Sequence, residues 1–145
     1  MKQLLFILFF ITSCSVWAQT EHNKLSMTIT KLQNFKKETK FEASSKDASY
    51  TGLANPEIKI KLSELLNRAA DDFIATTNSK PSEKKYQEDI KRGISRFNPF
   101  YLDLDTEDRE KICSYFEELM DCVELQSSGG ELNKWLYGFD PTKKQ

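Results

Sequence analysis

The sequence has few of the residues that nucleophilic catalysis and tight turns require. It contains one histidine, His22, in a polar stretch near the N-terminus that we expect to be disordered. Ser-His-Asp and Cys-His arrangements need a base that a rigid scaffold holds at hydrogen-bonding distance. We therefore expect no histidine-based catalytic site. The five glycines and four prolines also argue against a β-sandwich with many tight turns.

Charge of one sign and long apolar runs are lacking as well. The formal net charge is −1, and the 21 basic and 22 acidic side chains are interspersed. No basic stripe indicates a nucleic-acid partner, and no polybasic run indicates an anionic lipid surface. No apolar run reaches the about 20 residues that span a bilayer, so we expect no transmembrane segment.

The first 18 residues have the pattern of a secretory signal peptide. A short positive start precedes an apolar run at residues 4–11, and Val-Trp-Ala at 16–18 provides a cleavage site. Cleavage after Ala18 would release a soluble chain into the periplasm or the medium. A rival cut uses residues 11–14, Ile-Thr-Ser-Cys, which resemble a bacterial lipobox. Cys14 would then be lipidated and would attach the protein to a membrane, but its apolar continuation favours the soluble product.

Apolar residues beyond the leader recur every three or four positions, which is typical of amphipathic helices. We expect a disordered lead at 19–24, a single helical domain at 25–141 and a frayed tail at 142–145. The expected fold class is all-α, a compact bundle of four to five helices. The helices would cover about 25–40, 55–77, 82–97, 105–125 and 132–139, and an extended link would cover 99–105.

Several helix ends have recognisable caps. Asn55 followed by Pro56 predicts one helix start, and Asp105 or Thr106 predicts another. Gly129-Gly130 predicts a glycine end for the fourth helix. The apolar arc of that helix covers about half its circumference, so we expect it to be central, with neighbours on more than one flank.

Two cysteines remain after the leader, Cys113 and Cys122. If one helix carries both, nine residues separate them by about 13 Å along its axis, whereas the Cα atoms of a disulfide lie within about 7 Å. We expect two separate, largely buried thiols. No histidine lies near them, so we expect no metal site and no cofactor.

Acidic residues form two groups. Asp71-Asp72 could do acid–base chemistry with each other or with Asp103 or Asp105, which makes a carboxylate-based hydrolase one alternative function. A surface ion pair with Arg68 is the simpler interpretation. The run from Asp103 to Asp108 begins like a calcium loop, but it lacks the glycine and the final glutamate that such a loop needs.

The last predicted helix contains three aromatic residues within five positions, Trp135, Tyr137 and Phe139. They cannot all face one core, and Trp and Tyr are enriched at binding hot spots. We consider them candidate partner-binding residues. The commoner role of such a helix is to cover one side of the hydrophobic core. This alternative interpretation is retained.

Two stretches of the chain carry a resemblance to a known family: TGLANPEIKIKLSELLNRAADDFI and DTEDREKICSYFEELMDCVELQSSGGELNKWLYGFDP. They resemble an uncharacterised family of small bacterial proteins, the DUF4844 family. The resemblance covers about residues 25–141 and implies a helical fold and export, with no activity to carry over. We hypothesise an exported, non-catalytic interaction or inhibitor/immunity-type protein with an envelope or secreted protein as partner. The alternatives are the hydrolase and a small-molecule carrier with an apolar cavity between helices.

Overall fold

The structure is a computed structural model that describes residues 22–43 and 50–138. Every regular element within these ranges is helical. A first helix covers residues 22–37, and the elements after it are η1 (Pro56–Ile58), α2 (Lys59–Asn78), α3 (Glu83–Ser95), η2 (Asn98–Asp103), α4 (Thr106–Cys122) and α5 (Glu131–Tyr137). The predicted all-α bundle is confirmed. The predicted signal peptide, residues 19–21, Phe139 and the predicted C-terminal tail lie outside the described residues.

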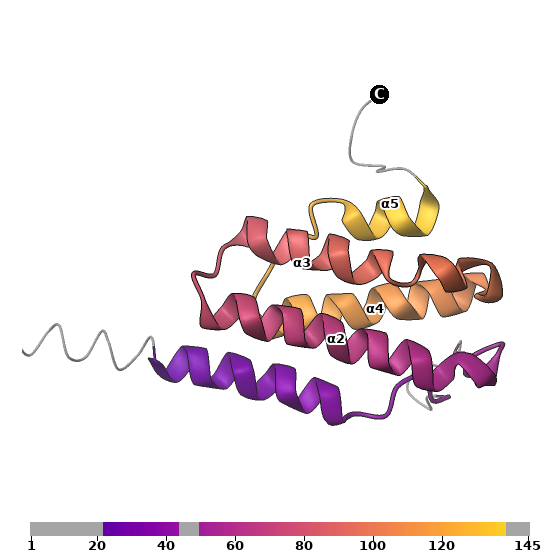
Figure 1. The fold of residues 1–145 in the computed structure, drawn as a ribbon, viewed down its shortest axis with the longest axis horizontal. Helices are drawn as coiled ribbons and strands as arrows, with labels where there is room; N and C mark the ends of the chain where they lie inside the picture. Colours follow the sequence, from indigo (N-terminus) through magenta and orange to yellow (C-terminus); the bar gives the residue numbers. More distant parts are fainter. Residues whose placement is uncertain (1–21, 44–49, 139–145) are drawn as a thin grey trace, which may run out of the picture.

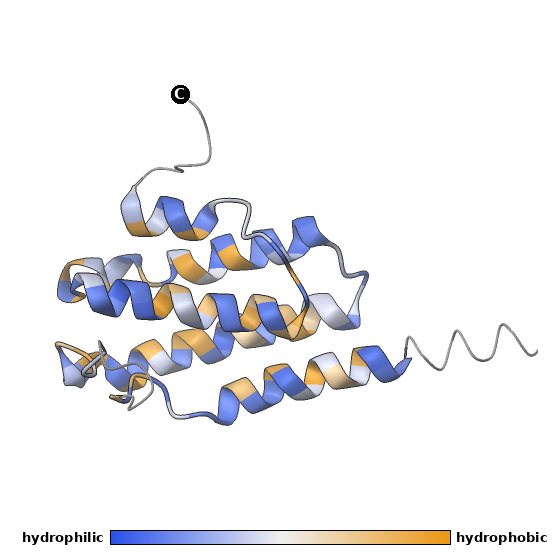
Figure 2. Ribbon diagram, turned by 180° about the vertical axis from the view of Figure 1, so that it is seen from behind, coloured by the Kyte–Doolittle hydropathy of each residue, from blue (hydrophilic) through white to orange (hydrophobic). Residues whose placement is uncertain are grey.

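The long helices lie side by side, and α5 lies on the side opposite the first helix (Figure 1). Helix α2 packs against α3 and α4, and α5 packs against α3 and α4. Figure 2 shows that apolar residues, in orange, alternate with polar residues along each helix, as expected when one face is buried. The core therefore sits between α2, α3, α4 and the first helix.

The predicted N-caps are confirmed by their hydrogen bonds. The Asn55 side chain accepts from the backbone N–H of Glu57 at 3.1 Å, and the chain then makes one 3₁₀ turn before α2. Asp105 caps α4, because its Oδ1 accepts from the N–H of Asp108 at 2.8 Å. These interactions satisfy helix N–H groups that have no partner within the helix.

Three local expectations were wrong. Residues 22–24, assigned to a disordered lead, are already helical. The predicted extended link is largely the 3₁₀ helix η2, in which Pro99 occupies an early position that needs no N–H donor. Helix α4 ends at Cys122, and Glu124 with φ of 59° takes the left-handed conformation predicted for glycine. Gly129 and Gly130 instead form the turn that leads into α5.

Helix α4 is central, as predicted. Ile112, Phe116 and Leu119 are fully buried on it. Phe116 lies so close to α3 that a Cβ on Gly93 would come within 2.7 Å of its ring. Gly93 therefore allows the close packing of α3 on α4, although glycine lowers the intrinsic stability of a helix by about 1 kcal/mol relative to alanine.

The two cysteines lie on α4 as free thiols, as predicted. Cys113 is buried and Cys122 is half-buried. Burial, followed by the negative charges of Glu117 and Glu110, raises the pKa of the Cys113 thiol to about 12. Cys113 is therefore a protonated, apolar-like side chain at neutral pH.

Candidate partner-binding cleft

Trp135 lies where α5 meets α3 and η2. Leu132, Trp135 and Leu136 share one face of α5, and this face packs against the core. The indole Nε1 donates a hydrogen bond to Oδ1 of Asn98 at 2.9 Å. The indole also meets the ring of Tyr101 edge-on, with centroids 5.3 Å apart. The tryptophan is thus held in one orientation by a polar and an aromatic contact.

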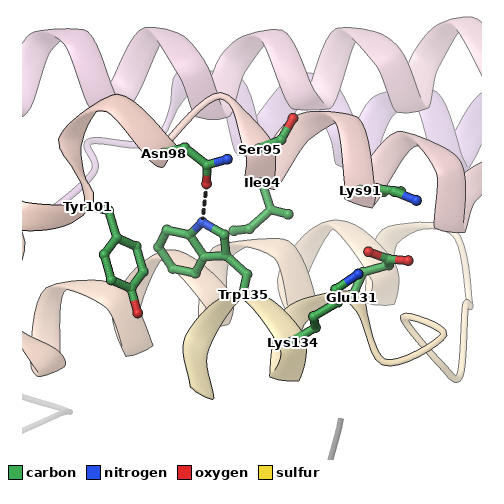
Figure 3. Close-up of a pocket in the computed structure, with 8 residues that line it drawn as sticks. All are labelled: Lys91, Ile94, Ser95, Asn98, Tyr101, Glu131, Lys134 and Trp135. Carbon is green, nitrogen blue, oxygen red and sulfur yellow. Dashed lines mark hydrogen bonds between the residues drawn. The ribbon is translucent and has the colours of Figure 1, made fainter. Parts of the chain in front are cut away.

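A cleft of about 340 Å³ lies beside this tryptophan (Figure 3). Its lining residues come from α3, η2 and α5, and they are Lys91, Ile94, Ser95, Asn98, Tyr101, Glu131, Lys134 and Trp135. Small-molecule sites usually enclose about 300–1,000 Å³, so the volume is at the low end of that range. The cleft lies between the outer elements of the bundle rather than in the core that the carrier alternative requires.

Tyr101 ties η2 to α5. Its hydroxyl donates to the carbonyl oxygen of Leu136 at 3.4 Å. The guanidinium carbon of Arg109 lies 4.5 Å from the centroid of the Tyr101 ring, within cation–π range. The left end of the cleft in Figure 3 is therefore held by residues of η2, α4 and α5.

The three aromatic residues predicted to bind a partner have different environments. Trp135 is half-buried against the core, and Tyr137 is 55% exposed. Phe139 lies outside the described residues. The sequence reasoning missed Leu102 of η2, which is 97% exposed. Its only signal in the sequence is an apolar side chain within the segment predicted to be an extended link.

The rim of the cleft has three charged side chains. Lys91 comes from α3, and Glu131 and Lys134 come from α5 (Figure 3). Within residues 22–43 and 50–138, none of the three has an ion-pair partner within 4.0 Å. The cleft thus combines an indole with charges that the rest of the described chain leaves unpaired.

The carboxylates proposed for hydrolysis point to different places. Asp71 pairs with Lys36 of the first helix, and Asp72 lies 2.7 Å from Arg96 of α3. These partners replace the expected Arg68. Asp105 caps α4, and none of the four candidate aspartates lines the Trp135 cleft. A second cleft of about 250 Å³, near the connection between α2 and α3, does not include them either.

Three buried charged side chains, Lys40, Asp89 and Asp108, escaped prediction. Asp108 is 1% exposed and accepts hydrogen bonds from the hydroxyl of Tyr50 at 3.2 Å and the N–H of Ala54 at 3.3 Å. Lys40 is buried with its Nζ 3.9 Å from the centroid of the Phe35 ring. Its Nζ donates to the carbonyl oxygens of Phe35 and Glu38, which lie at the end of the first helix. Burial lowers the pKa of Lys40 from its usual value.

Burial also raises the pKa of two other polar side chains, Tyr50 and Asp89. Burial, reinforced by the charge of Asp108, raises the pKa of Tyr50 well above its usual value. On the opposite side of the bundle, burial raises the pKa of Asp89, although Thr76 and Arg92 oppose this by hydrogen bonding. Both aspartates accept hydrogen bonds from other elements, which is the usual condition for burying a carboxylate.

Within the described ranges, no three histidine, cysteine, aspartate or glutamate side chains are grouped so as to hold a metal ion. No helix in the described part of the chain is both long and apolar enough to cross a membrane.

These elements define a small all-α domain with a surface cleft beside its last helix. The chain belongs to the family described as "Domain of unknown function (DUF4844)", whose model matches residues 20–140. The resemblance drawn from the sequence is therefore confirmed. The fold is similar to the crystal structure of a DUF3571 family protein from Acinetobacter baumannii AYE, with 37% identity and a TM-score of 0.71. The alignment covers 80% of this chain and 93% of that chain. A search of curated proteins found no match.

Proposed function

We propose that this protein is a non-catalytic interaction protein that binds another protein through the surface formed by η2 and α5. The observation that carries the proposal is the pair of exposed apolar side chains, Leu102 and Tyr137, beside a tryptophan that is held in place. An inhibitor or immunity-type protein that blocks an enzyme is one form of this function.

The two exposed residues belong to segments that contact each other. Tyr101 precedes Leu102, and its hydroxyl is bonded to the carbonyl of Leu136, which precedes Tyr137. Figure 1 shows the end of α5 close to η2 at one end of the bundle. Leu102 is 97% and Tyr137 55% exposed. Aromatic anchors contribute most of the energy in many interfaces, and a side chain that is already ordered loses less entropy on binding.

We also propose that the protein acts outside the cytoplasm. The support is the leader pattern of residues 1–18, together with a family match that starts at residue 20. The partner would then be another envelope or secreted protein. The intact mass of the protein recovered from its host distinguishes the forms: unmodified from Gln19 for the soluble product, or diacylglyceryl-modified from Cys14 for a lipoprotein. A mass that retains residues 1–18 would contradict export by either route.

Site-specific photo-crosslinking tests the interaction surface. A photo-reactive phenylalanine analogue is placed at Leu102 or Tyr137, and the protein is irradiated in the cells that produce it. Ile60 of α2 and Met27 of the first helix are matched controls, because they are 76% and 64% exposed apolar residues elsewhere on the surface. We expect one crosslinked protein, identified by mass spectrometry, from positions 102 and 137 and not from the control positions.

Equal crosslinking from all four positions would show non-specific contact and would contradict the proposal. So would crosslinks from Ile60 or Met27 alone, because the partner would then use a different face. Loss of the crosslink on Trp135→Ala, in a variant with unchanged thermal unfolding, would further support the role of the held indole.

A further inference from the structure

The charged side chains around Trp135 indicate which kind of peptide segment the cleft can bind. Lys91 on α3 and Lys134 on α5 reach the cleft from two different helices (Figure 3). Neither lysine has an ion-pair partner in the described part of the chain. The lining thus has two positive groups against one negative group, Glu131.

Two arginines at the C-terminal end of α3 are already neutralised. Arg92 pairs with Asp89 and lies 3.5 Å from Asp72, and Arg96 lies 2.7 Å from Asp72. The contacts with Asp72 bind the end of α3 to α2, whereas the pair between Arg92 and Asp89 lies within α3. The lysines at the cleft have no comparable structural role, so their charges are available to a ligand.

Glu131 has a role within its own helix. It is the first residue of α5, and a carboxylate in the first turn interacts favourably with the partial positive charge at a helix N-terminus. Gly130, which precedes it, provides no side-chain cap. The negative charge at the rim is therefore explained by α5 itself, whereas the two lysines are not explained by the fold.

Ile94 and Trp135 give the cleft an apolar wall, and Asn98 fixes the orientation of the indole. We infer that the cleft binds an acidic peptide segment of the partner protein. An apolar side chain of the segment packs on Trp135, and carboxylates on either side of it pair with Lys91 and Lys134. This inference rests on the proposed function, and it adds the chemistry of the bound segment.

Fluorescence of Trp135 reports on the cleft directly. The chain has two tryptophans, and Trp17→Phe leaves Trp135 as the sole indole whichever processed form is recovered. The probe is a capped synthetic peptide, Glu-Ala-Phe-Ala-Glu. Two further peptides, with both glutamates replaced by glutamine or by lysine, are matched controls. We expect the acidic peptide to shift the emission of Trp135 saturably and to bind several-fold more tightly than the glutamine peptide.

Charge variants of the cleft should change this affinity in opposite directions. Lys91→Gln and Lys134→Gln should each weaken binding about two- to fivefold, as expected for one exposed ion pair. Glu131→Gln should strengthen it by a similar factor. Lys84→Gln is the control, since this exposed lysine of α3 does not line the cleft but changes the net charge equally. Added salt should weaken binding of the acidic peptide more than that of the glutamine peptide.

Equal affinity for the acidic and glutamine peptides would overturn the inference, and so would preference for the lysine peptide. Competition by inorganic phosphate as strong as that by the acidic peptide would also overturn it, because the cleft would then recognise any anion. Crosslinking from Leu102 and Tyr137 with no peptide binding would refute only the acidic segment. Absence of both would refute the proposed interaction surface as well.

Discussion

Helix α4 has two flanks that are built differently. On the flank of the first helix, the hydroxyl of Tyr115 accepts a hydrogen bond from the N–H of Phe41 at 2.7 Å, and its ring meets those of Phe35 and Phe41 edge-on. Two charged groups on this flank, Lys40 and Asp108, are buried and bonded to backbone or to tyrosine. On the flank of α5, apolar and charged side chains reach the surface around a cleft.

The difference indicates a division of roles. Buried polar groups with complete hydrogen bonding are costly to disturb, so they hold the first helix and residues 50–54 in place on α4. The α5 flank has few such bonds and relies on Trp135, Tyr101 and Leu132 for its packing. We expect substitutions on the first flank to change stability and those on the second to change binding.

The largest effect at neutral pH should come from Asp108. Asp108→Ala leaves the hydroxyl of Tyr50 and the N–H of Ala54 without an acceptor, so we expect the free energy of unfolding to fall by about 3 kcal/mol. Urea denaturation would show a lower midpoint with an unchanged slope. Asp71→Ala is the control, because its pair with Lys36 is exposed and should contribute less than about 1 kcal/mol. Equal losses for the two variants would remove the distinction between buried and exposed carboxylates.

The next effect concerns pH. Cys113 lies two residues before Tyr115, about 160° around α4 and so on the edge away from the first helix. Its folded pKa of about 12 exceeds the ordinary value of 9.0. The folded state therefore keeps a proton that the unfolded state loses above pH 9. The contribution of the protonated thiol to the free energy of unfolding is fully present below pH 9 and is lost as the pH rises towards 12.

Cys113→Ala should therefore make the decline in the free energy of unfolding between pH 9 and 12 less steep, by about 1.4 kcal/mol per pH unit. Denaturant titrations at several pH values measure the slope, and tyrosine and lysine titrations cancel between the two proteins. Cys122→Ala is the matched control and should change the slope less, because Cys122 is only half-buried. An unchanged slope in Cys113→Ala would mean that the thiol is solvated.

The smallest stability effect should come from the α5 flank. Asn98→Ala removes the acceptor of the indole N–H, which water can replace, so we expect a loss of about 0.5–1 kcal/mol. The emission of Trp135 should shift to longer wavelength as the indole becomes more hydrated. Ser95→Ala is the control, because Ser95 also lines the cleft but bonds to the carbonyl of Arg92. If Asn98→Ala destabilised the protein as much as Asp108→Ala, the two flanks would be equivalent.

Local signals in the sequence predicted most of the fold. The caps at Asn55 and Asp105 act within three residues of themselves, and the apolar stripes have the helical period, so both could be read from the chain. The prediction of an extended link where η2 lies was wrong, because Pro99 is compatible both with an extended segment and with the first turn of a helix. The ion pair of Asp71 was assigned to Arg68 because sequence spacing shows neighbours on the same helix and not those on another.

The parts that escaped prediction depend on contacts between distant residues. Asp108 is separated from Tyr50 by 58 positions, and Phe41 from Tyr115 by 74. Nothing near Lys40 in the chain distinguishes it from the exposed lysines around it. The cleft itself was not predicted. Trp135 was named from its aromatic cluster, but Asn98 and Lys91 come to line a cleft beside it only through the packing of α3, η2 and α5.

Gly93 of α3 also restricts the position of α3 along the axis of α4. The ring of Phe116 fits where Gly93 has no side chain. Sliding α3 by one turn towards its C-terminus would bring Asp89 to that position, and its side chain leaves no room for an aromatic ring. The pair therefore permits one axial offset between the two helices. The position of η2, which follows α3 directly, is thereby fixed to within less than a turn, and with it the distance between Asn98 and the helix that carries Trp135.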